Sequence, residues 1–235
     1  MKIGVISAME SEHRRLTERL TDRNEVVVPG GQIFVEGRLG VNKMVLMQCG
    51  IGKVNAAVGA LELIRSHRPQ CIISTGVAGG IDEGLSVGDV VAGAECTYHD
   101  VWCGPGCEPG QVQGLPTRFA AHPTLLEHAL KAVDPDGRVH IVAGLICTGD
   151  RFITERSELA DIKAKHPDGL AVDMESAAIA QVCHMRRVPF LSFRIISDTP
   201  GVDGHTQQYT DFWTELADRS FVTTYRFLRK LPAAL

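Results

Sequence analysis

The chain has 235 residues, of which 44% are hydrophobic and 22% are charged, as expected of one globular domain covering residues 1–235. A net charge of −4, without a run of lysine or arginine, argues against a nucleic-acid partner. No apolar stretch approaches the roughly 20 residues that span a bilayer, and the first one stops at Glu10, too early for a secretory signal. We therefore predict a cytoplasmic protein with neither a nucleic-acid nor a membrane partner.

Strand-like and helix-like segments alternate along the chain, judged from short apolar runs and from helical apolar stripes. The expected strands are 2–7, 26–28, 33–37, 43–48, 71–75, 87–95, 139–146, 169–172 and 190–196. The expected helices are 10–20, 53–66, 123–133, 155–165, 176–186 and 209–231. This alternation predicts an α/β fold, a three-layer α/β/α sandwich around a mixed, twisted β-sheet.

Two acidic residues stand where an apolar core would not place them. Glu175 follows the expected strand 169–172 and opens a helix, and Asp198 follows Ser197 at the end of the strand 190–196. Ligands of open α/β sheets bind outside the carboxyl ends of the strands, so we expect both carboxylates to converge on one small molecule. Taken singly, each has a structural alternative, Glu175 as a helix N-terminal charge and Asp198 as a turn residue.

Arg194 projects from the same strand, which is otherwise mostly apolar. A buried cation requires a partner, and the expected one is Glu175, Glu12 or a water between them. A purely structural buried Arg–Glu pair is the alternative.

Five sequence motifs follow one another over nearly the whole chain. They are Lys-Ile-Gly-Val-Ile-Ser-Ala-Met-Glu-Ser-Glu at 2–12, Gly-Ile-Gly-Lys-Val-Asn-Ala-Ala at 50–57, Thr-Gly-Val-Ala-Gly-Gly at 75–80, Ala-Val-Asp-Met-Glu-Ser-Ala-Ala at 171–178 and Phe-Arg-Ile-Ile-Ser-Asp at 193–198. Together they resemble the nucleoside phosphorylase/hydrolase superfamily and, more narrowly, the 5'-methylthioadenosine/S-adenosylhomocysteine nucleosidases. The resemblance implies a nucleoside phosphorylase-like fold and an enzyme that hydrolyses the N-glycosidic bond of 5'-substituted adenosines to adenine and the thioribose. No cofactor is expected.

Cleavage of a purine N-glycosidic bond needs protonation of the leaving base, negative charge near the ribose, and a deprotonated water on the opposite face. Asp198 is the candidate acid, because desolvation at a strand end raises the pKa of a carboxyl. The resemblance selects Glu12 rather than Glu10 as the base for water, and a solvated acid in the first turn of a helix is the alternative. Glu175 is expected to accept hydrogen bonds from the ribose 2'- and 3'-hydroxyls.

The resemblance also implies how the nucleoside is held. Phe152 is expected to stack on the adenine, with the Ile153 backbone at the adenine edge, although a core phenylalanine is the commoner case. The glycine-rich segment 75–80 is expected to be a turn whose backbone approaches the ribose and the base. The other expected lining residues are Met9, Ile51, Val77, Ala78, Gly79, Val172, Asp173, Met174, Ser197 and Tyr209.

Two of these positions depart from the family pattern. Asp173 stands where many of these nucleosidases carry glutamate, which is one methylene longer. Val77 replaces a hydroxyl residue found in several relatives, so a side-chain hydrogen bond from this position is not expected.

A phosphorylase would need an anion site. Relatives that use phosphate carry a Gly-Asp-Pro-x-Arg turn after the first strand, where this chain has Ser-Ala-Met-Glu at 7–10, and the Glu12 carboxylate would repel phosphate. Hydrolysis is therefore favoured over a phosphate-dependent purine nucleoside phosphorylase. A futalosine-type nucleosidase with another 5' group stays open. The joint presence of Glu12, Glu175 and Asp198 argues against a non-catalytic nucleoside-binding protein.

The segment 99–116 is irregular, with Val101, Trp102 and Leu115 among several glycines and prolines. A loop this apolar is not expected to stay solvated, and C2 pairing is the commonest assembly. Together with the resemblance, this predicts a homodimer in which the loop covers the partner's 5' pocket. A loop that folds back on its own subunit is the alternative.

Seven cysteines are scattered without a Cys-x-x-Cys pair. His99, Cys103 and Cys107 lie near one another in the irregular segment, but a zinc site would need a fourth ligand and more closely spaced cysteines. We therefore predict reduced thiols and no metal site.

Overall fold

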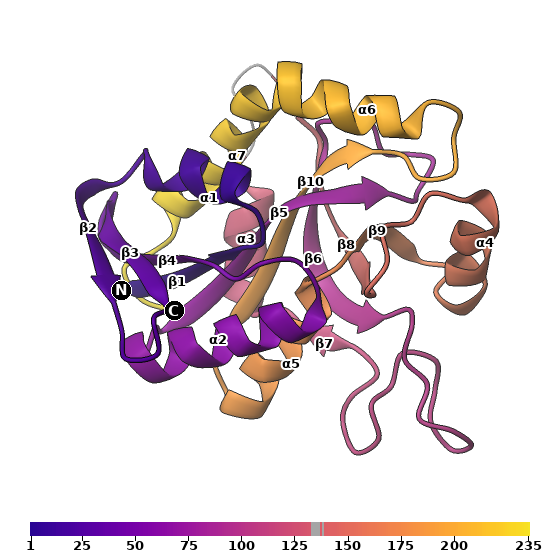
Figure 1. Cartoon of the computed structure of the whole chain (residues 1–235), viewed down its shortest axis with the longest axis horizontal. Helices are drawn as coiled ribbons and strands as arrows, with labels where there is room; N and C mark the ends of the chain where they lie inside the picture. Colours follow the sequence, from indigo (N-terminus) through magenta and orange to yellow (C-terminus); the bar gives the residue numbers. More distant parts are fainter. Residues whose placement is uncertain (133–136, 138) are drawn as a thin grey trace.

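A computed structural model describes residues 1–132, 137 and 139–235, which form one mixed sheet with helices on both faces (Figure 1). This arrangement confirms the predicted α/β/α sandwich. None of the helices in these residues is long and apolar enough to cross a membrane.

The strands are β1 (Lys2–Ser7), β2 (Thr21–Val27), β3 (Ile33–Leu39), β4 (Asn42–Gln48), β5 (Cys71–Gly80), β6 (Val90–Tyr98), β7 (Phe119–Ala120), β8 (Ile141–Thr148), β9 (Gly169–Asp173) and β10 (Phe190–Asp198). The helices are α1 (Glu10–Thr17), α2 (Lys53–His67), α3 (Pro123–Leu130), α4 (Arg156–Lys165), α5 (Ser176–Arg186), α6 (His205–Asp211) and α7 (Ala217–Lys230), with the π-helical turn η1 (Phe212–Leu216) between α6 and α7.

The sheet partly closes on itself. Its strands follow the order β10-β6-β8-β9-β5-β1-β4-β3-β2, with β7 beside β6. In addition, β10 pairs in parallel with β5 while it is antiparallel to β6. β9 pairs in parallel with β8 and antiparallel with the end of β5. This double pairing brings the carboxyl ends of β5, β9 and β10 together.

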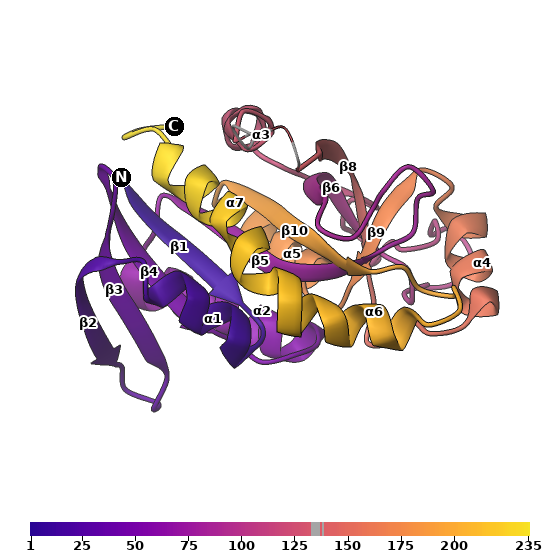
Figure 2. The ribbon, with the colours of Figure 1, turned by 90° about the horizontal axis from the view of Figure 1, so that it is seen from above.

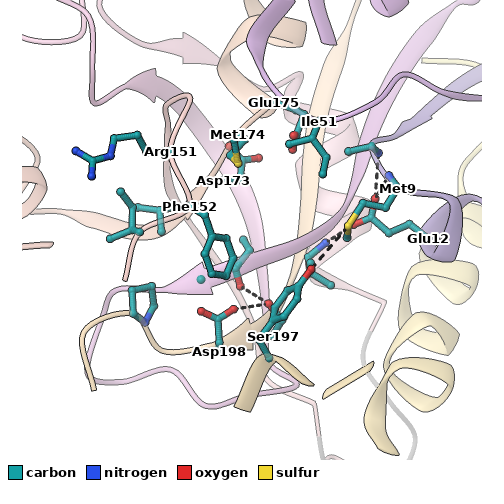
Figure 3. Close-up of a pocket in the computed structure, with 18 residues that line it drawn as sticks. Met9, Glu12, Ile51, Arg151, Phe152, Asp173, Met174, Glu175, Ser197 and Asp198 are labelled. Carbon is teal, nitrogen blue, oxygen red and sulfur yellow. Dashed lines mark hydrogen bonds between the residues drawn. The ribbon is translucent and has the colours of Figure 1, made fainter. Parts of the chain in front are cut away.

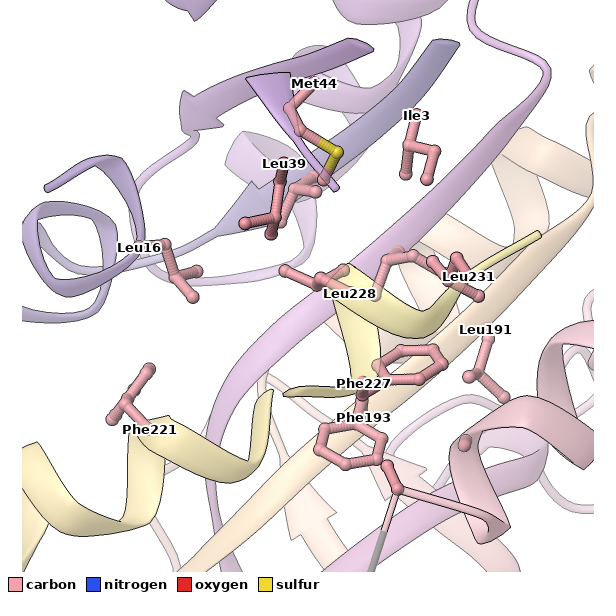
Figure 4. Packing of buried hydrophobic residues seen from close by; sticks show 14 of the residues in the cluster. Ile3, Leu16, Leu39, Met44, Leu191, Phe193, Phe221, Phe227, Leu228 and Leu231 are labelled. Atoms are coloured by element: carbon pink, nitrogen blue, oxygen red, sulfur yellow. The ribbon is translucent and has the colours of Figure 1, made fainter. Parts of the chain in front are cut away.

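Two helical layers cover the sheet (Figure 2). α2 and α5 pack together on one face, where small residues such as Ala60 and Ala177 belong to the core. α1, α3 and α7 cover the other face. There Phe193 of β10 stacks on Phe227 of α7, with ring centroids 4.7 Å apart (Figure 4). This aromatic stack ties the C-terminal helix to the strand that ends in Asp198.

The glycine-rich segment 75–80 is not the turn that we expected, because β5 continues to its last residue, Gly80. The missing side chains make this possible where strands crowd at the closure. A Cβ on Gly79 would lie 2.6 Å from Cγ of Pro200, and one on Gly80 would lie 2.9 Å from Cγ2 of Ile196.

Other boundaries differ by a few residues. The helix expected over 10–20 ends at Thr17, and Leu20 packs over Gly37 of β3 from a turn. The last helix begins earlier than expected, at His205, and contains η1. The helix expected over 123–133 ends at Leu130, and residue 133 lies outside the described residues. β2 begins before the expected strand, β6 and β8 begin later than theirs, and β7 was not predicted.

Candidate active site

A cavity of roughly 620 Å³, counting its open mouth, lies at the carboxyl ends of β5, β9 and β10 (Figure 3). This is the crevice in which ligands of α/β sheets bind. The segments that follow β1, β4 and β8 and the helix α6 complete its walls. It is lined by Ala8, Met9, Glu12, Ile51, Val77, Ala78, Gly79, Arg151, Phe152, Ile153, Val172, Asp173, Met174, Glu175, Ser197, Asp198, Pro200 and Tyr209.

Glu12, in the first turn of α1, is buried, with 1% of its surface exposed. Its Oε2 accepts hydrogen bonds from the backbone N–H groups of Ala8 and Met9, and its Oε1 accepts one from Val77, all at 3.0 Å. Burial raises the pKa of this carboxyl, while Arg194 and the three N–H groups lower it. The alternative of a solvated helix charge is therefore wrong, and Glu12 is a fixed carboxylate in the cavity wall.

Asp198 reaches the cavity through an irregularity in β10. The register of β10 against β5 shifts between Ile196 and Asp198, so Ser197 is the extra residue of a β-bulge, which re-aims the strand end. The Ser197 hydroxyl donates to Oδ1 of Asp198 at 2.6 Å. Burial raises the pKa of Asp198, against the opposing effects of Ser197 and His205. A raised pKa suits a group that must donate a proton near neutral pH.

Glu175 lies at the N-terminus of α5 and is almost fully buried. Its Oε1 accepts a hydrogen bond from the backbone N–H of Gly52 at 3.0 Å, which links the end of β9 to the start of α2. Burial raises the pKa of this carboxyl to about 7, although Arg194 lowers it. Glu175 is therefore a wall carboxyl that titrates close to neutral pH.

Arg194 is the one predicted site residue that does not line the cavity. Its guanidinium is buried behind the wall, with Nε 2.9 Å from Oδ2 of Asp173 and Nη2 3.7 Å from Oε2 of Glu175. Glu175, one of the partners that we expected, does form an ion pair with Arg194, but the nearest carboxylate is that of Asp173, which we did not predict as a partner. The reason is the direction of the Asp173 side chain, which turns toward the strands, where Oγ1 of Thr148 donates to it at 2.6 Å.

Aromatic rings form the outer wall. Phe152 is 50% exposed, so it is not the core phenylalanine of the alternative interpretation. Its ring centroid lies 5.4 Å from that of Tyr209 and 5.9 Å from that of His205. Figure 3 shows Phe152 and Asp198 on one side of the cavity and Glu12 on the other. The Phe152 ring can stack on a flat ligand. Asp198 and Glu12 would then lie at two different sides of that ligand.

Apart from Arg194, all the residues that we expected in the site line this one cavity. The sequence analysis missed three further lining residues, Ala8, Arg151 and Pro200, although each lies within two positions of a predicted one. It also missed a group of hydroxyls behind the wall. Their only signal was polarity within or beside buried apolar strands, and they are Ser74, Thr148, Ser176 and Ser192.

The irregular segment 99–116 contains the histidine and the two cysteines that were considered as metal ligands. Within residues 1–132 and 139–235, no group of three His, Cys, Asp or Glu side chains is placed to hold a metal ion. Cys103 and Cys107 carry free thiols. Val101 and Leu115 pack back onto the core of their own subunit, whereas Trp102 is 64% exposed. Part of the segment thus folds back, and its tryptophan stays on the surface.

Comparison with known proteins gives consistent matches. The family model of the phosphorylase superfamily matches residues 2–229. A 5'-methylthioadenosine/S-adenosylhomocysteine nucleosidase of Bacillus thuringiensis subsp. konkukian is 40% identical over 206 residues, which is 87% of this chain and 89% of that protein. The nucleosidase of Colwellia psychrerythraea, solved with adenine, superposes with a TM-score of 0.93 at 36% identity, covering 100% of this chain and 97% of that one. The Neisseria meningitidis enzyme, solved with methylthio-immucillin-A, gives a TM-score of 0.91 at 38% identity, covering 98% and 99%.

Gly76 of β5 lies against both Glu12 and Arg194. A Cβ at this position would overlap with Oε1 of Glu12 and with Nη1 of Arg194. We expect Gly76→Ala to displace both side chains and to slow the reaction in this cavity by about 100-fold, the size of effect that small misplacements in a site produce. Gly84→Ala is the control, because Gly84 lies in an exposed turn. Steady-state kinetics and thermal melting of both variants would test this, and a fully active Gly76→Ala enzyme would contradict it.

Proposed function

The chain belongs to the phosphorylase superfamily and, within it, to the 5'-methylthioadenosine/S-adenosylhomocysteine nucleosidases, and from this premise we propose how its cavity performs the reaction. The protein is an enzyme that hydrolyses the N-glycosidic bond of these 5'-substituted adenosines and releases adenine. One observation carries the assignment of roles: three buried carboxyl groups, Glu12, Glu175 and Asp198, line a single cavity from three different elements.

Asp198 is the acid. The purine stacks on Phe152 at the side of the cavity where Asp198 lies, and the protonated Asp198 carboxyl donates its proton to N7 of the base. The electron pair of the glycosidic bond then leaves with a base that is close to neutral. The bulge at Ser197 and the Ser197 hydroxyl support this role, because they aim and hold the Asp198 carboxyl.

Glu12 is the base. A water between Glu12 and the anomeric carbon gives its proton to the Glu12 carboxylate as its oxygen bonds to that carbon. Three backbone N–H groups hold the Glu12 side chain in place, so the base needs no reorganisation when the bond breaks.

Glu175 binds the ribose. It accepts hydrogen bonds from the 2'- and 3'-hydroxyls and places negative charge beside the sugar as it becomes oxocarbenium-like. We do not assign the Asp173 carboxylate to the substrate, because its oxygens are already occupied by Thr148, Ser176 and Arg194.

Water rather than phosphate is the nucleophile that this cavity accepts. The Glu12 carboxylate lies where an anion would have to bind, and the cavity is lined by several further acids. Among the lining residues Arg151 is the one cation, and it is paired with Glu158. Repulsion between phosphate and the acidic wall therefore favours hydrolysis.

The assembly and the cellular setting complete the proposal. Residues 1–235 act as one domain, which the shared sheet supports. The free state of all seven cysteines fits the reducing cytoplasm. Two copies pair through an apolar surface on the outer side of α2, where Val54 and Val58 are 74% and 53% exposed. Ile51 continues this surface into the mouth of the cavity, so a partner seated there would cover the 5' end of the substrate. That the segment 99–116, with its exposed Trp102, covers the partner's 5' pocket stays a prediction.

We expect Glu12→Gln and Asp198→Asn each to lower kcat by about 10²–10⁴-fold, the usual contribution of a general base or acid. Wild-type kcat should fall at low pH as Glu12 becomes protonated and at high pH as Asp198 loses its proton. Nucleoside binding should persist in both variants. The measurements are adenine release in phosphate-free buffer across pH and isothermal titration with 5'-methylthioadenosine. Activity within a few-fold of wild type, or a strict need for phosphate, would overturn the assignment.

Glu175→Ala should weaken binding as well as rate, because a grip on the ribose hydroxyls acts before and during bond breaking. In the wild type the affinity for 5'-methylthioadenosine should decline as pH falls through about 7, since the carboxyl then gains a proton and loses acceptor capacity. Titration calorimetry on both proteins at several pH values would measure this. An unchanged affinity in Glu175→Ala would contradict the ribose assignment.

We expect a dimer by light scattering at micromolar concentration, and a monomer with reduced activity for the double variant Val54→Glu, Val58→Glu. Burying the two introduced glutamate charges in an apolar interface costs more free energy than the apolar contact contributes. Val41→Glu is the matched control, since Val41 is equally exposed but lies in the β3–β4 turn. A fully active wild-type monomer would sink the dimer proposal.

A further inference from the structure

A cage of hydroxyl groups surrounds the guanidinium of Arg194 behind the cavity wall. Ser74, Thr148, Ser176 and Ser192 are each fully buried, and none of them lines the cavity. Two of them bond to Arg194 directly: Nε donates to Oγ of Ser176 at 3.1 Å, and Nη2 donates to Oγ of Ser74 at 2.9 Å. A buried polar network of this kind makes a structure rigid when every group in it has a hydrogen-bond partner.

Ser176 is the centre of this cage, and its bonding is complete. Its hydroxyl has one proton, which it donates to Oδ2 of Asp173, because an ionised carboxylate only accepts. Its two lone pairs accept from Nε of Arg194 and from the hydroxyl of Ser192, whose Oγ lies 2.6 Å away. The direction of the Ser192 hydrogen bond is therefore fixed, and Ser176 has no capacity left for another partner.

Asp173 is held just as firmly. Its Oδ1 accepts from Thr148 at 2.6 Å, and the backbone N–H of Ser176 donates to its two oxygens at 3.3 and 3.2 Å. Oγ1 of Thr148 in turn accepts from the backbone N–H of Ala177 at 2.9 Å. The cage thus joins β8, the end of β9, the first turn of α5 and β10 into one network around Arg194.

Arg194 connects this network to two carboxyl groups of the cavity, Glu175 and Glu12. Its Nη2 lies 3.7 Å from Oε2 of Glu175. On its other side, Nη1 and Oε1 of Glu12 both border the position of Gly76. Arg194 also lowers the pKa of both Glu12 and Glu175 against the effect of burial. A guanidinium displaced by even a fraction of an ångström would therefore change the position and the charge state of both carboxylates.

We propose that Ser176 and Ser192 are positioning residues for hydrolysis, which act by fixing the Arg194 guanidinium between Asp173, Glu175 and Glu12. The proposal rests on the catalytic roles given above to Glu12 and Glu175. In geometric terms, the Ser176 hydroxyl bridges the short Asp173 side chain to Nε of Arg194 and to Ser192.

The first test is the variant Ser176→Ala. It removes the bridge, so we expect kcat to fall about ten-fold or more. We also expect the acidic limb of the kcat–pH profile to move to higher pH, since a loosened Arg194 lowers the pKa of Glu12 less. Ser192→Ala removes only the hydroxyl that donates to Ser176. It should shift kcat and the acidic limb in the same directions as Ser176→Ala, by smaller amounts. Ser220→Ala, a buried serine of α7, is the matched control and should leave both unchanged.

The second test is rescue. One added methylene extends the carboxylate at position 173 by about one carbon–carbon bond, ~1.5 Å, into the space of the deleted Ser176 hydroxyl. We expect Asp173→Glu to restore kcat and the pH profile in the Ser176→Ala background, and to lower kcat in the wild-type background, where the hydroxyl leaves no room. If Asp173→Glu raises kcat in one background and lowers it in the other, positions 173 and 176 are directly coupled. A general loss of stability does not produce such a reversal.

The proposal fails if Ser176→Ala keeps the wild-type kcat and pH profile, or if Asp173→Glu is equally harmful in both backgrounds. Should Ser176→Ala not fold, Ser192→Ala decides on the same two readouts. An inactive Glu12→Gln beside an unaffected Ser176→Ala would overturn the positioning role alone. An active Glu12→Gln would overturn the catalytic assignment beneath it.

Discussion

The structure of the site depends on one buried cation. Arg194 lies out of reach of water, and a charge in that position is tolerated only with close partners. Asp173 supplies the nearest one, and Glu175 and Glu12 lie on its other sides. With three acids around one cation, acidic groups outnumber cations beside the proposed ribose site. Burial, and at Glu175 also the neighbouring acids, raises the pKa of the Glu12 and Glu175 carboxyls at rest. Their negative charge would stabilise a sugar that becomes positively charged as the glycosidic bond breaks.

The fold supplies this arrangement by closing the sheet. Because β10 pairs with both β5 and β6, and β9 with both β8 and β5, strand ends that an open sheet would spread apart meet at one cavity. Crowding at the closure is relieved by glycine: Gly76 leaves room for Glu12 and Arg194, and Gly79 leaves room for Pro200. The bulge at Ser197 then turns Asp198 into the space that remains. Backbone geometry thus sets Asp198 and Glu12, the proposed acid and base, at different sides of one cavity.

The cavity has two zones with different physical roles. At the rear, carboxylates, a guanidinium and hydroxyls form a fully bonded network that has little freedom to move. At the mouth, Ile51 and Phe152 are exposed and apolar. Rigid polar groups suit the reacting bond, because they are already oriented when charge develops. An exposed apolar mouth suits a 5' substituent and a second subunit, which are recognised by burial of surface.

The sequence by itself determined the fold class and the order of the elements, because these follow from hydrophobic periodicity. It also indicated nearly all of the lining residues, through the resemblance of its motifs to a known family. It indicated Glu175 and Asp198 through their place after strands, and Glu12 through the resemblance of the first motif to the family. Only the tertiary structure decided that 75–80 is a strand, that Asp173 is the closest partner of Arg194, and that Ser176 and Ser192 complete its support. These features depend on contacts between β8, β9, α5 and β10, which lie far apart in the chain. No periodicity within a single segment encodes how such segments meet, since pairing and side-chain direction are set where the strands close on one another.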